Sequence, residues 1–188
     1  MCYFYLKNNK ICKDIKYSSR FNVDFNNHLY NSGIDQLKNI VDTLKNNPND
    51  RRMICSAWNP LALPYVSLPS CHYGFQVTVI GDELNLAWNQ RSCDVLLGIP
   101  ANISSYALLL HLLAKESNLK EGKLIGFLMD THIYKSHLEG AKIQLTQETY
   151  DLPTIKTDKF SSIFDWEYTD TELVGYKSSD PIKYVVAI

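Results

Sequence analysis

The sequence has no long uninterrupted apolar run and no excess of charge of either sign. Its longest apolar stretch, YALLLHLLA at residues 106–114, is too short to cross a membrane and contains His111. The 19 Lys and Arg side chains nearly balance the 20 Asp and Glu, which gives a formal net charge of −1. We therefore expect no membrane partner and no nucleic-acid partner, because the chain has neither an apolar anchor nor a general basic attraction.

Metal-binding motifs are also missing, since the sequence contains no CxxC and no HExxH. We therefore expect no structural or catalytic metal. The first residues, MCYFYLKNNK, lack the basic-then-apolar order of a secretory signal. This favours a cytoplasmic protein with reduced thiols. The five cysteines are scattered along the chain, at Cys2, Cys12, Cys55, Cys71 and Cys93.

Repeats and low-complexity linkers are absent as well. The 188 residues are 45% hydrophobic and 21% charged, which is typical of a globular chain. This predicts a single domain over residues 1–188, long enough to bury one core. Residues 1–32 have little periodicity and many Asn, Lys and Tyr, so we expect a divergent N-terminal segment of extended or loop structure.

Hydrophobic periodicity predicts three helices. Apolar side chains recur at helical spacing within residues 32–50, from Ile34 to Leu44, and Pro48 ends the pattern. Residues 102–118 form an apolar segment that predicts a buried helix, and residues 134–147 predict an amphipathic one.

The predicted strands fall between these helices. Residues 51–59 predict a short strand, and alternation over residues 73–91 predicts a hairpin that turns at Gly81-Asp82. Residues 123–129 predict a further strand, and the final IKYVVAI predicts a strand or an extended tail. Because strands and helices do not alternate steadily, the pattern favours an α+β fold over a doubly wound sheet.

Cys71 and His72 stand side by side in LPSCHYGFQ, residues 68–76. A thiolate is a strong nucleophile once its pKa falls, and a nearby Arg or protonated His lowers that pKa. Cysteine is equally a common core residue. This pair alone therefore leaves both a catalytic and a structural role open.

Two further segments suit anions. In QRSCD, residues 90–94, Arg91 and Ser92 suit a phosphate or carboxylate, and Asp94 suits a ring N–H. The planar forks of Arg51 and Arg52 suit a phosphate held by two hydrogen bonds. Taken singly, each segment is explained as well by ordinary surface charge.

The fourth segment is DTHIY, residues 130–134. In an extended chain Asp130, His132 and Tyr134 share one face, and adjacent His and Tyr donors suit sugar hydroxyls. A His and a Tyr at the edge of a core would give the same pattern. Together, the four segments describe one site with a thiol, arginines for a dianion, and polar groups that can bind a polar ring.

The segments that carry this chemistry resemble the thymidylate synthase family. The family's motifs occur in the family's order, over about residue 33 to the end of the chain. The resemblance implies a mixed β-sheet packed against helices, with one sheet face forming a homodimer interface. The matching segments are RRMICSAWNP, LPSCHYGFQ, WNQRSCDVLLGIPANISSYALLLHLLA, DTHIY, and the ending SIFDWEYTDTELVGY with IKYVVAI.

The resemblance implies reductive methylation of dUMP to dTMP, with 5,10-methylenetetrahydrofolate as co-substrate. Cys71 would attack C6 of the uracil, which is covalent catalysis. Arg91 would contact both the thiol and the phosphate, and Ser92 would bind the phosphate. Arg51 and Arg52 would reach the phosphate in the neighbouring subunit, so the site would be complete only in a homodimer.

The resemblance also assigns the residues around the base and sugar. The amide of Asn102 would donate to O4 of uracil and accept from N3–H, whereas cytosine presents the opposite pattern. His132 and Tyr134 would hold the 3′-hydroxyl of the deoxyribose. Gln90 and His72 would belong to the polar network around the ring.

On the folate side, the resemblance implies that Asp94 holds the pterin ring. It also implies that the C-terminal tail closes over both ligands. The folate side would be lined by Leu68, Leu97, Gly98 and Ala187. The residues implied to be catalytic are Cys71, Arg91, Asp94 and Asn102.

The chain departs from the family pattern at several places. Its N-terminal part carries no recognisable arginine loop, catalytic glutamate or folate-contacting tryptophan, and Ala101 replaces a Phe that commonly packs on the folate. We therefore expect this chain alone to bind dUMP with little thymidylate formation. Two alternatives stay open: a dUMP hydroxymethylase with the same thiol and folate, and a truncated dUMP-binding homologue without turnover.

Overall fold

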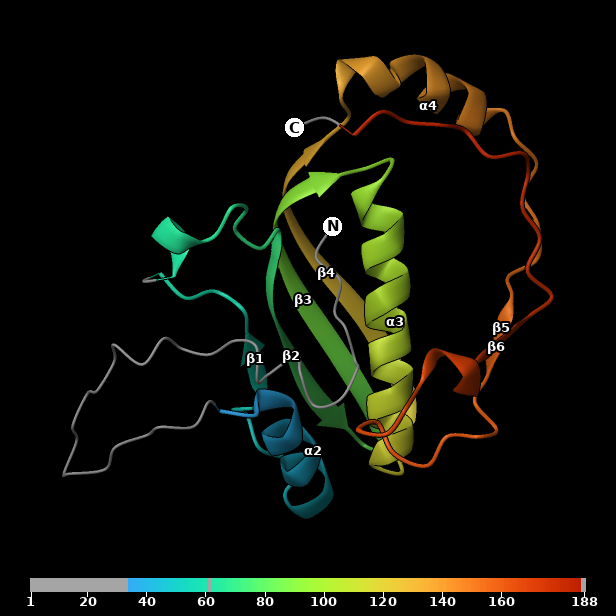
Figure 1. The fold of residues 1–188 in the computed structure, drawn as a ribbon. Helices are drawn as coiled ribbons and strands as arrows, with labels where there is room; N and C mark the ends of the chain where they lie inside the picture. Colours follow the sequence, from blue (N-terminus) through green and yellow to red (C-terminus); the bar gives the residue numbers. More distant parts are fainter. Residues whose placement is uncertain (1–33, 61, 187–188) are drawn as a thin grey trace.

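A four-stranded mixed sheet forms the centre of the molecule (Figure 1). The computed structural model describes residues 34–60 and 62–186. The sheet order is β1-β2-β3-β4, in which the first three strands are antiparallel and β4 is parallel to β3. The strands are β1 (Ile54–Ser56), β2 (His72–Ile80), β3 (Glu83–Asp94) and β4 (Lys120–His132).

Three helices and a small second sheet complete the described chain. The two strands of the second sheet pair antiparallel, and no signal in the sequence predicted them. The helices are α2 (Gln36–Asn46), α3 (Gly98–Glu116) and α4 (Leu138–Leu145), and the second sheet consists of β5 (Thr154–Lys156) and β6 (Glu172–Val174).

The predicted hairpin is confirmed. Strands β2 and β3 join at Gly81-Asp82, and Gly81 has φ +66, a conformation that glycine adopts without steric cost. The alternating apolar side chains of both strands lie on one face. That face contributes Val77, Leu84 and Leu86 to the core, each fully buried.

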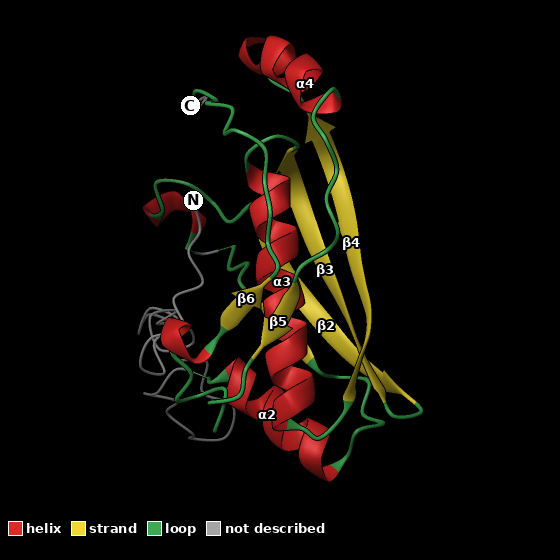
Figure 2. Ribbon diagram, turned by 90° about the vertical axis from the view of Figure 1, so that its right-hand side faces the viewer, coloured by secondary structure: helices red, strands yellow, loops and turns green. Residues whose placement is uncertain are grey.

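Helix α3 crosses from the end of β3 to the start of parallel β4 and covers one face of the sheet (Figures 1 and 2). Parallel strands need such a crossover connection. The helix packs Tyr106, Leu110 and Leu113 onto the sheet, all of them buried. One turn-making residue, Pro100, falls in the first turn of α3, where its missing N–H breaks no helical hydrogen bond.

Helix α2 is shorter than predicted. It begins at Gln36, where the side chain of Asp35 accepts a hydrogen bond from Lys38 N at 2.9 Å and so caps the helix. It ends at Asn46, before Pro48. The apolar stripe is confirmed, since Ile40, Val41 and Leu44 are buried. The predicted N-terminal segment, residues 1–32, lies outside the described residues.

Several predicted boundaries were wrong. Strand β3 continues to Asp94, so QRSCD lies within the strand and not after it, and β4 extends three residues beyond residues 123–129 at each end. Helix α3 begins at Gly98, four residues earlier than predicted. The segment 134–147 starts as a 3-10 turn, and α4 has no buried side chain. Up to Val186 the C-terminal segment is extended and forms no strand.

The second face of the sheet is uncovered within the described chain (Figure 2), and on β4 it carries a patch of exposed apolar side chains. Strand register places Ile125 and Phe127 on this face, beside Ala87 and Asn89 of β3. Ile125 is 41% exposed, Phe127 55% and Met129 74%. An exposed apolar patch of this kind is typical of a surface that associates with another protein.

No helix within residues 34–60 or 62–186 has the length and apolar character needed to span a membrane.

Gly126 of β4 leaves room for the ring of Trp88. A Cβ on Gly126 would lie 2.5 Å from Cζ2 of Trp88 and 2.6 Å from Cη2, far inside van der Waals contact. The register pairs the two residues directly across β3 and β4. The indole ring of Trp88 therefore occupies the space that a side chain on residue 126 would need.

We expect Gly126→Ala to lower the free energy of unfolding by about 1–3 kcal/mol, because the added methyl group overpacks the core. Urea denaturation measures the change. In a Trp88→Leu background the same substitution should cost much less, since the ring is gone. An equal cost in both backgrounds would contradict this explanation.

Candidate active site

Most of the predicted site residues lie at one end of the four-stranded sheet, where β2 begins and where β3 and β4 end. Strand register pairs His72 with Gln90 and Asp94 with His132. This end is at the top of the sheet in Figure 1, near the start of α3. Three of the four segments singled out in the sequence, those with Cys71, Arg91 and His132, therefore lie at this end of the sheet.

The turn before Cys71 is held by Arg91. The backbone N–H of Arg91 donates to Cys71 O at 2.8 Å. Its guanidinium donates through Nε to Ser70 O at 3.0 Å and through Nη2 to Pro69 O at 2.7 Å. Because a guanidinium has five N–H donors, others are left for a ligand. The guanidinium carbon also lies 5.9 Å from the ring centre of Trp58.

Cys71 differs from the other described thiols in its exposure. Cys71 is partly exposed, whereas Cys55 and Cys93 are buried. Burial raises the pKa of Cys93, which keeps that thiol protonated and unreactive. Among the described cysteines, Cys71 is therefore the one placed to meet a ligand. Cys2 and Cys12 lie outside the described residues.

His72 faces the core instead of the open end of the site. It is 5% exposed, and its Nδ1 lies 2.9 Å from the hydroxyl of Tyr106. The two rings meet edge to face, with their centres 5.5 Å apart. Desolvation lowers the pKa of His72, so the neutral imidazole is favoured. Sequence reasoning did not single out Tyr106, which reads as an ordinary aromatic residue of an apolar helix.

Gln90 and Asn102 form a hydrogen-bonded pair of amides, of which Gln90 is buried and Asn102 is half-buried. Nε2 of Gln90 donates to Oδ1 of Asn102 at 2.9 Å and to the backbone carbonyl of Ser92 at 3.0 Å. The indole N–H of Trp88 donates to Oε1 of Gln90 at 3.2 Å. Asn102 lies in the second turn of α3, so this contact joins the helix to β3 at the site. Trp88 was predicted only as an alternating core residue.

Asp94 lies where β3 ends and the chain turns into α3. Its Oδ1 accepts hydrogen bonds from the backbone N–H groups of Leu96 and Leu97, at 3.2 and 3.4 Å. Gly98 is next to both Asp94 and Asn102, because a Cβ on it would be 3.7 Å from Asp94 Cβ and from Asn102 Oδ1. Leu97 and Leu68 are exposed. Ala187 lies outside the described residues.

His132 and Tyr134 lie together beside this carboxylate, as predicted. Their rings meet edge to face with centres 5.0 Å apart, and both side chains are half-buried. Nδ1 of His132 lies 3.1 Å from Asp130 O, so the proton on Nδ1 donates to that carbonyl. This tautomer leaves Nε2 as an acceptor for a ligand hydroxyl.

His137 is a site residue that sequence reasoning missed. It is fully buried, and its Nε2 donates to the backbone carbonyl of Val185 at 2.7 Å. Nδ1 lies 3.9 Å from Asp94 Oδ1 and has no hydrogen-bond partner among the described residues. His137 therefore connects the C-terminal segment with the end of β3. The sequence gives no signal for His137, because this residue falls within the segment predicted as an amphipathic helix.

Arg51 and Arg52 are not brought to the Cys71 end of the sheet. Both are exposed, and Arg52 forms an ion pair with Asp50, with Nη2 to Oδ2 at 2.6 Å. Arg52 lowers the pKa of Asp50 to about 2. The next residue, Met53, pairs with Val77, five positions along β2 from the start of that strand. Arg52 therefore lies opposite Thr78, seven positions from Cys71, or about 23 Å along the sheet, and Arg51 lies farther still.

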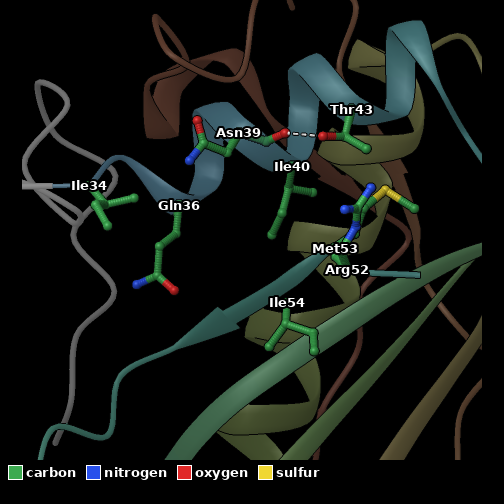
Figure 3. Close-up of a pocket in the computed structure, with 8 residues that line it drawn as sticks. All are labelled: Ile34, Gln36, Asn39, Ile40, Thr43, Arg52, Met53 and Ile54. Atoms are coloured by element: carbon green, nitrogen blue, oxygen red, sulfur yellow. Dashed lines mark hydrogen bonds between the residues drawn. The ribbon is translucent and has the colours of Figure 1, made fainter. Parts of the chain in front are cut away.

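A hollow lies between α2 and β1, away from Cys71 (Figure 3). Its volume is about 280 Å³, and Asn39 and Thr43 on its wall are joined by a hydrogen bond of 2.6 Å from Thr43 Oγ1 to Asn39 O. Of the predicted site residues it contains Arg52 alone. The lining residues are Ile34, Gln36, Asn39, Ile40, Thr43, Arg52, Met53 and Ile54.

The fold and the site define a mixed-sheet protein in which a partly exposed thiol, a pair of amides, a carboxylate and a His–Tyr pair lie at the same end of the sheet. A comparison with protein families identifies the class further, because the family model described as thymidylate synthase matches residues 11–188. The chain belongs to the thymidylate synthase family.

Individual relatives agree with this family. A thymidylate synthase of Staphylococcus haemolyticus is 47% identical over 82% of this chain and 48% of its own length. One of Mycoplasma genitalium is 48% identical over 77% of this chain and 50% of its own length. A bifunctional dihydrofolate reductase-thymidylate synthase of Paramecium tetraurelia is 48% identical over 84% of this chain and 34% of its own length. The chain thus spans about half the length of its single-function relatives.

Burial of His72 predicts a pH dependence of stability. Its folded pKa lies below the unfolded value of about 6.5, so in the interval between the two the unfolded chain binds a proton that the folded chain does not. The contribution of His72 is therefore complete above about pH 6.5 and is lost as the pH falls through the folded pKa.

We expect the free energy of unfolding to fall more steeply between about pH 7 and pH 5 in the native chain than in a His72→Gln variant, which cannot take up this proton. Urea denaturation at several pH values measures both slopes. Equal slopes would show that His72 does not titrate differently on unfolding.

Proposed function

We propose that this chain carries the thymidylate synthase reaction, the reductive methylation of dUMP to dTMP with 5,10-methylenetetrahydrofolate. The observation that carries the proposal is the position of Cys71. It is a partly exposed thiol directly before the start of β2, whose backbone carbonyl accepts from Arg91 N, and its neighbour His72 pairs with Gln90, which bonds Asn102. Family membership and the names of the relatives support the same reaction.

In this mechanism the thiolate of Cys71 adds to C6 of the uracil. A sulfur–carbon bond forms, and the π electrons of the C5–C6 bond move toward O4, which makes C5 a carbon nucleophile. Arg91 holds the turn that carries Cys71 through its hydrogen bonds to Ser70 O and Pro69 O. Asn102 donates to O4 and so stabilises the charge that develops there.

The remaining parts of dUMP are assigned to groups near Cys71. Ser92 and the unused N–H donors of Arg91 bind the phosphate. The Nε2 acceptor of His132 and the hydroxyl of Tyr134 hold the 3′-hydroxyl of the sugar. The partly exposed edge of this ring pair supports the assignment. Gln90 positions the amide of Asn102, and buried His72 contacts the hydroxyl of Tyr106.

The proposal includes a homodimer in which each subunit donates Arg51 and Arg52 to its partner's phosphate site. Two observations support it. The arginines are exposed and too distant to serve the Cys71 of their own chain. The uncovered sheet face that carries Ile125 and Phe127 is the kind of apolar surface that a second copy would cover.

The folate side also fits the residues present. All contacts of the Asp94 carboxylate among the described residues are made through Oδ1, which leaves Oδ2 to accept from ring N–H groups of a pterin. Exposed Leu68 and Leu97 offer apolar surface, and Gly98 adds no bulk. Ala187 would close this side from the tail. The folate, when bound, supplies the one-carbon unit and the hydride.

The location proposed for this chemistry is the cytoplasm, where a reducing environment keeps Cys71 as a thiol. No group of three His, Cys, Asp or Glu side chains in the described ranges is arranged to hold a metal ion. The mechanism assigns no step to one.

Replacing the nucleophile gives the most direct prediction. We expect the chain to release tritium from C5-labelled dUMP when folate is added, at a low rate because no catalytic glutamate is recognisable in its N-terminal part, and Cys71→Ser to reduce release by roughly 10³-fold or more while dUMP still binds. Cys93→Ser, which removes a buried thiol on the adjacent strand, is the matched control and should retain release. Mass analysis of the product separates a methyl from a hydroxymethyl group.

Release that persists in Cys71→Ser would remove Cys71 from the mechanism. Binding of dUMP without any release by the native chain would favour a nucleotide-binding role without turnover.

The shared site predicts complementation between two inactive variants. Cys71→Ser lacks the nucleophile, and the double variant Arg51→Ala/Arg52→Ala lacks the donated arginines, so we expect each alone to be inactive. After the two are unfolded and refolded together, mixed dimers should contain one intact site and regain tritium release. No recovery, when mixed dimers do form, would show that the arginines serve their own chain.

A further inference from the structure

We infer that Trp88 is a positioning residue that determines which pyrimidine the site accepts, by setting the direction in which the amide of Asn102 faces. The inference rests on the proposed function, in which Asn102 contacts the base. Trp88 is a core residue that is assigned no contact with either ligand. It acts through a chain of hydrogen bonds, and the direction of each bond is fixed by which groups can donate and which can accept.

The indole of Trp88 is held in one position. The side chain is 3% exposed and stacks on Tyr106, with ring centres 5.1 Å apart and planes 14° from parallel. On its other side the ring lies over Gly126, which has no Cβ to displace it. The ring therefore cannot turn its N–H group away without losing this packing.

The direction of the Gln90 amide follows from this arrangement. An indole N–H can only donate and a backbone carbonyl can only accept. Trp88 Nε1 meets Oε1 of Gln90, and the carbonyl of Ser92 meets Nε2. If the amide were reversed, two donors would face each other at one end and two acceptors at the other. Because Gln90 is 1% exposed, water could not relieve the mismatch.

The same logic passes to Asn102. Since Gln90 presents Nε2, its partner atom at 2.9 Å must be the acceptor Oδ1. The Nδ2 group of Asn102 must then face the other way, while Oδ1 keeps a second lone pair. A free Asn side chain has no such preference, because its two amide orientations have almost the same shape. The orientation of Asn102 is therefore imposed from Trp88 through Gln90.

This fixed amide distinguishes uracil from cytosine. With uracil, Nδ2 donates to O4 and Oδ1 accepts from N3–H. With cytosine, Nδ2 would face an amino group and Oδ1 would face the lone pair of N3, so both contacts would be mismatched. If Asn102 could reverse at no cost, it would match either base. Loss of the Trp88 donor should therefore weaken discrimination more than it weakens binding itself.

The test compares the dissociation constants of dUMP and dCMP for the whole chain, native and Trp88→Phe. Phe keeps a stacked ring but has no N–H donor. We expect the ratio of dCMP to dUMP dissociation constants to fall by about tenfold, the factor that corresponds to one hydrogen bond of ordinary net strength. Affinity for dCMP should stay the same or rise.

Trp166→Phe is the matched control. Trp166 is also partly buried against the core and donates its indole N–H, to Thr171 Oγ1 at 2.9 Å, but it does not contact the amide pair. The variant loses an equivalent hydrogen bond elsewhere in the fold, and we expect its nucleotide ratio to match that of the native chain. A similar fall in both variants would show a general loss of stability and would overturn the inference.

A second background tests whether the effect passes through Asn102. In Asn102→Ala the contact that discriminates the bases is gone, so adding Trp88→Phe should leave the ratio unchanged. A further fall of the ratio in this background would contradict the relay. Should Trp88→Phe fail to fold, Gln90→Leu breaks the chain at its middle residue and must also collapse the ratio; an unchanged ratio there overturns the inference.

The proposed function and the role of Trp88 are contradicted by different results. If the native chain binds neither nucleotide, the proposed function fails. If it binds dUMP selectively and Trp88→Phe binds it with unchanged selectivity, the proposed function stands and the role of Trp88 is rejected.

Discussion

The stacking of Trp88 on Tyr106 is the interaction on which the site depends, because it joins the sheet to its crossover helix. Tyr106 belongs to α3 and reaches with its hydroxyl to His72, the neighbour of Cys71. Trp88 belongs to β3 and reaches with its indole N–H to the amide pair that ends on α3. The thiol side and the amide side of the site are thus aligned by one pair of rings, far more rigidly than loop contacts would allow.

The sheet uses its two faces for different purposes. The face under α3 holds the core and carries polar side chains at one end, whereas the other face carries an exposed apolar patch on β4 and is uncovered within the described chain. Strand β1 runs antiparallel beside β2, and this carries Arg52 away from Cys71. In the function proposed for this family member, a single subunit can therefore supply the thiol and the base contacts but not every phosphate contact.

Much of the fold could be predicted where periodicity was regular, as in the β2–β3 hairpin with its glycine turn and in the apolar stripe of α2. Prediction failed where polar site residues interrupt the pattern: QRSCD is strand, although its composition is typical of a loop. The reactive segments were identified, yet their supports were not, because Trp88 and Tyr106 are ordinary core types in sequence. Buried His137 likewise shows its importance only in three dimensions, where the C-terminal segment meets Asp94.

The close packing of the Trp88 ring against Gly126 constrains how related chains can diverge. A large ring filling this space could come from either strand, with a small or aliphatic residue opposite it, and the core would be equally full. A ring carried by β4 would not place an N–H beside Gln90 from the same direction. A substitution that looks neutral for packing would thus change the source of the hydrogen bond that orients the amides. In such a lineage, some other donor would have to evolve together with the exchanged pair.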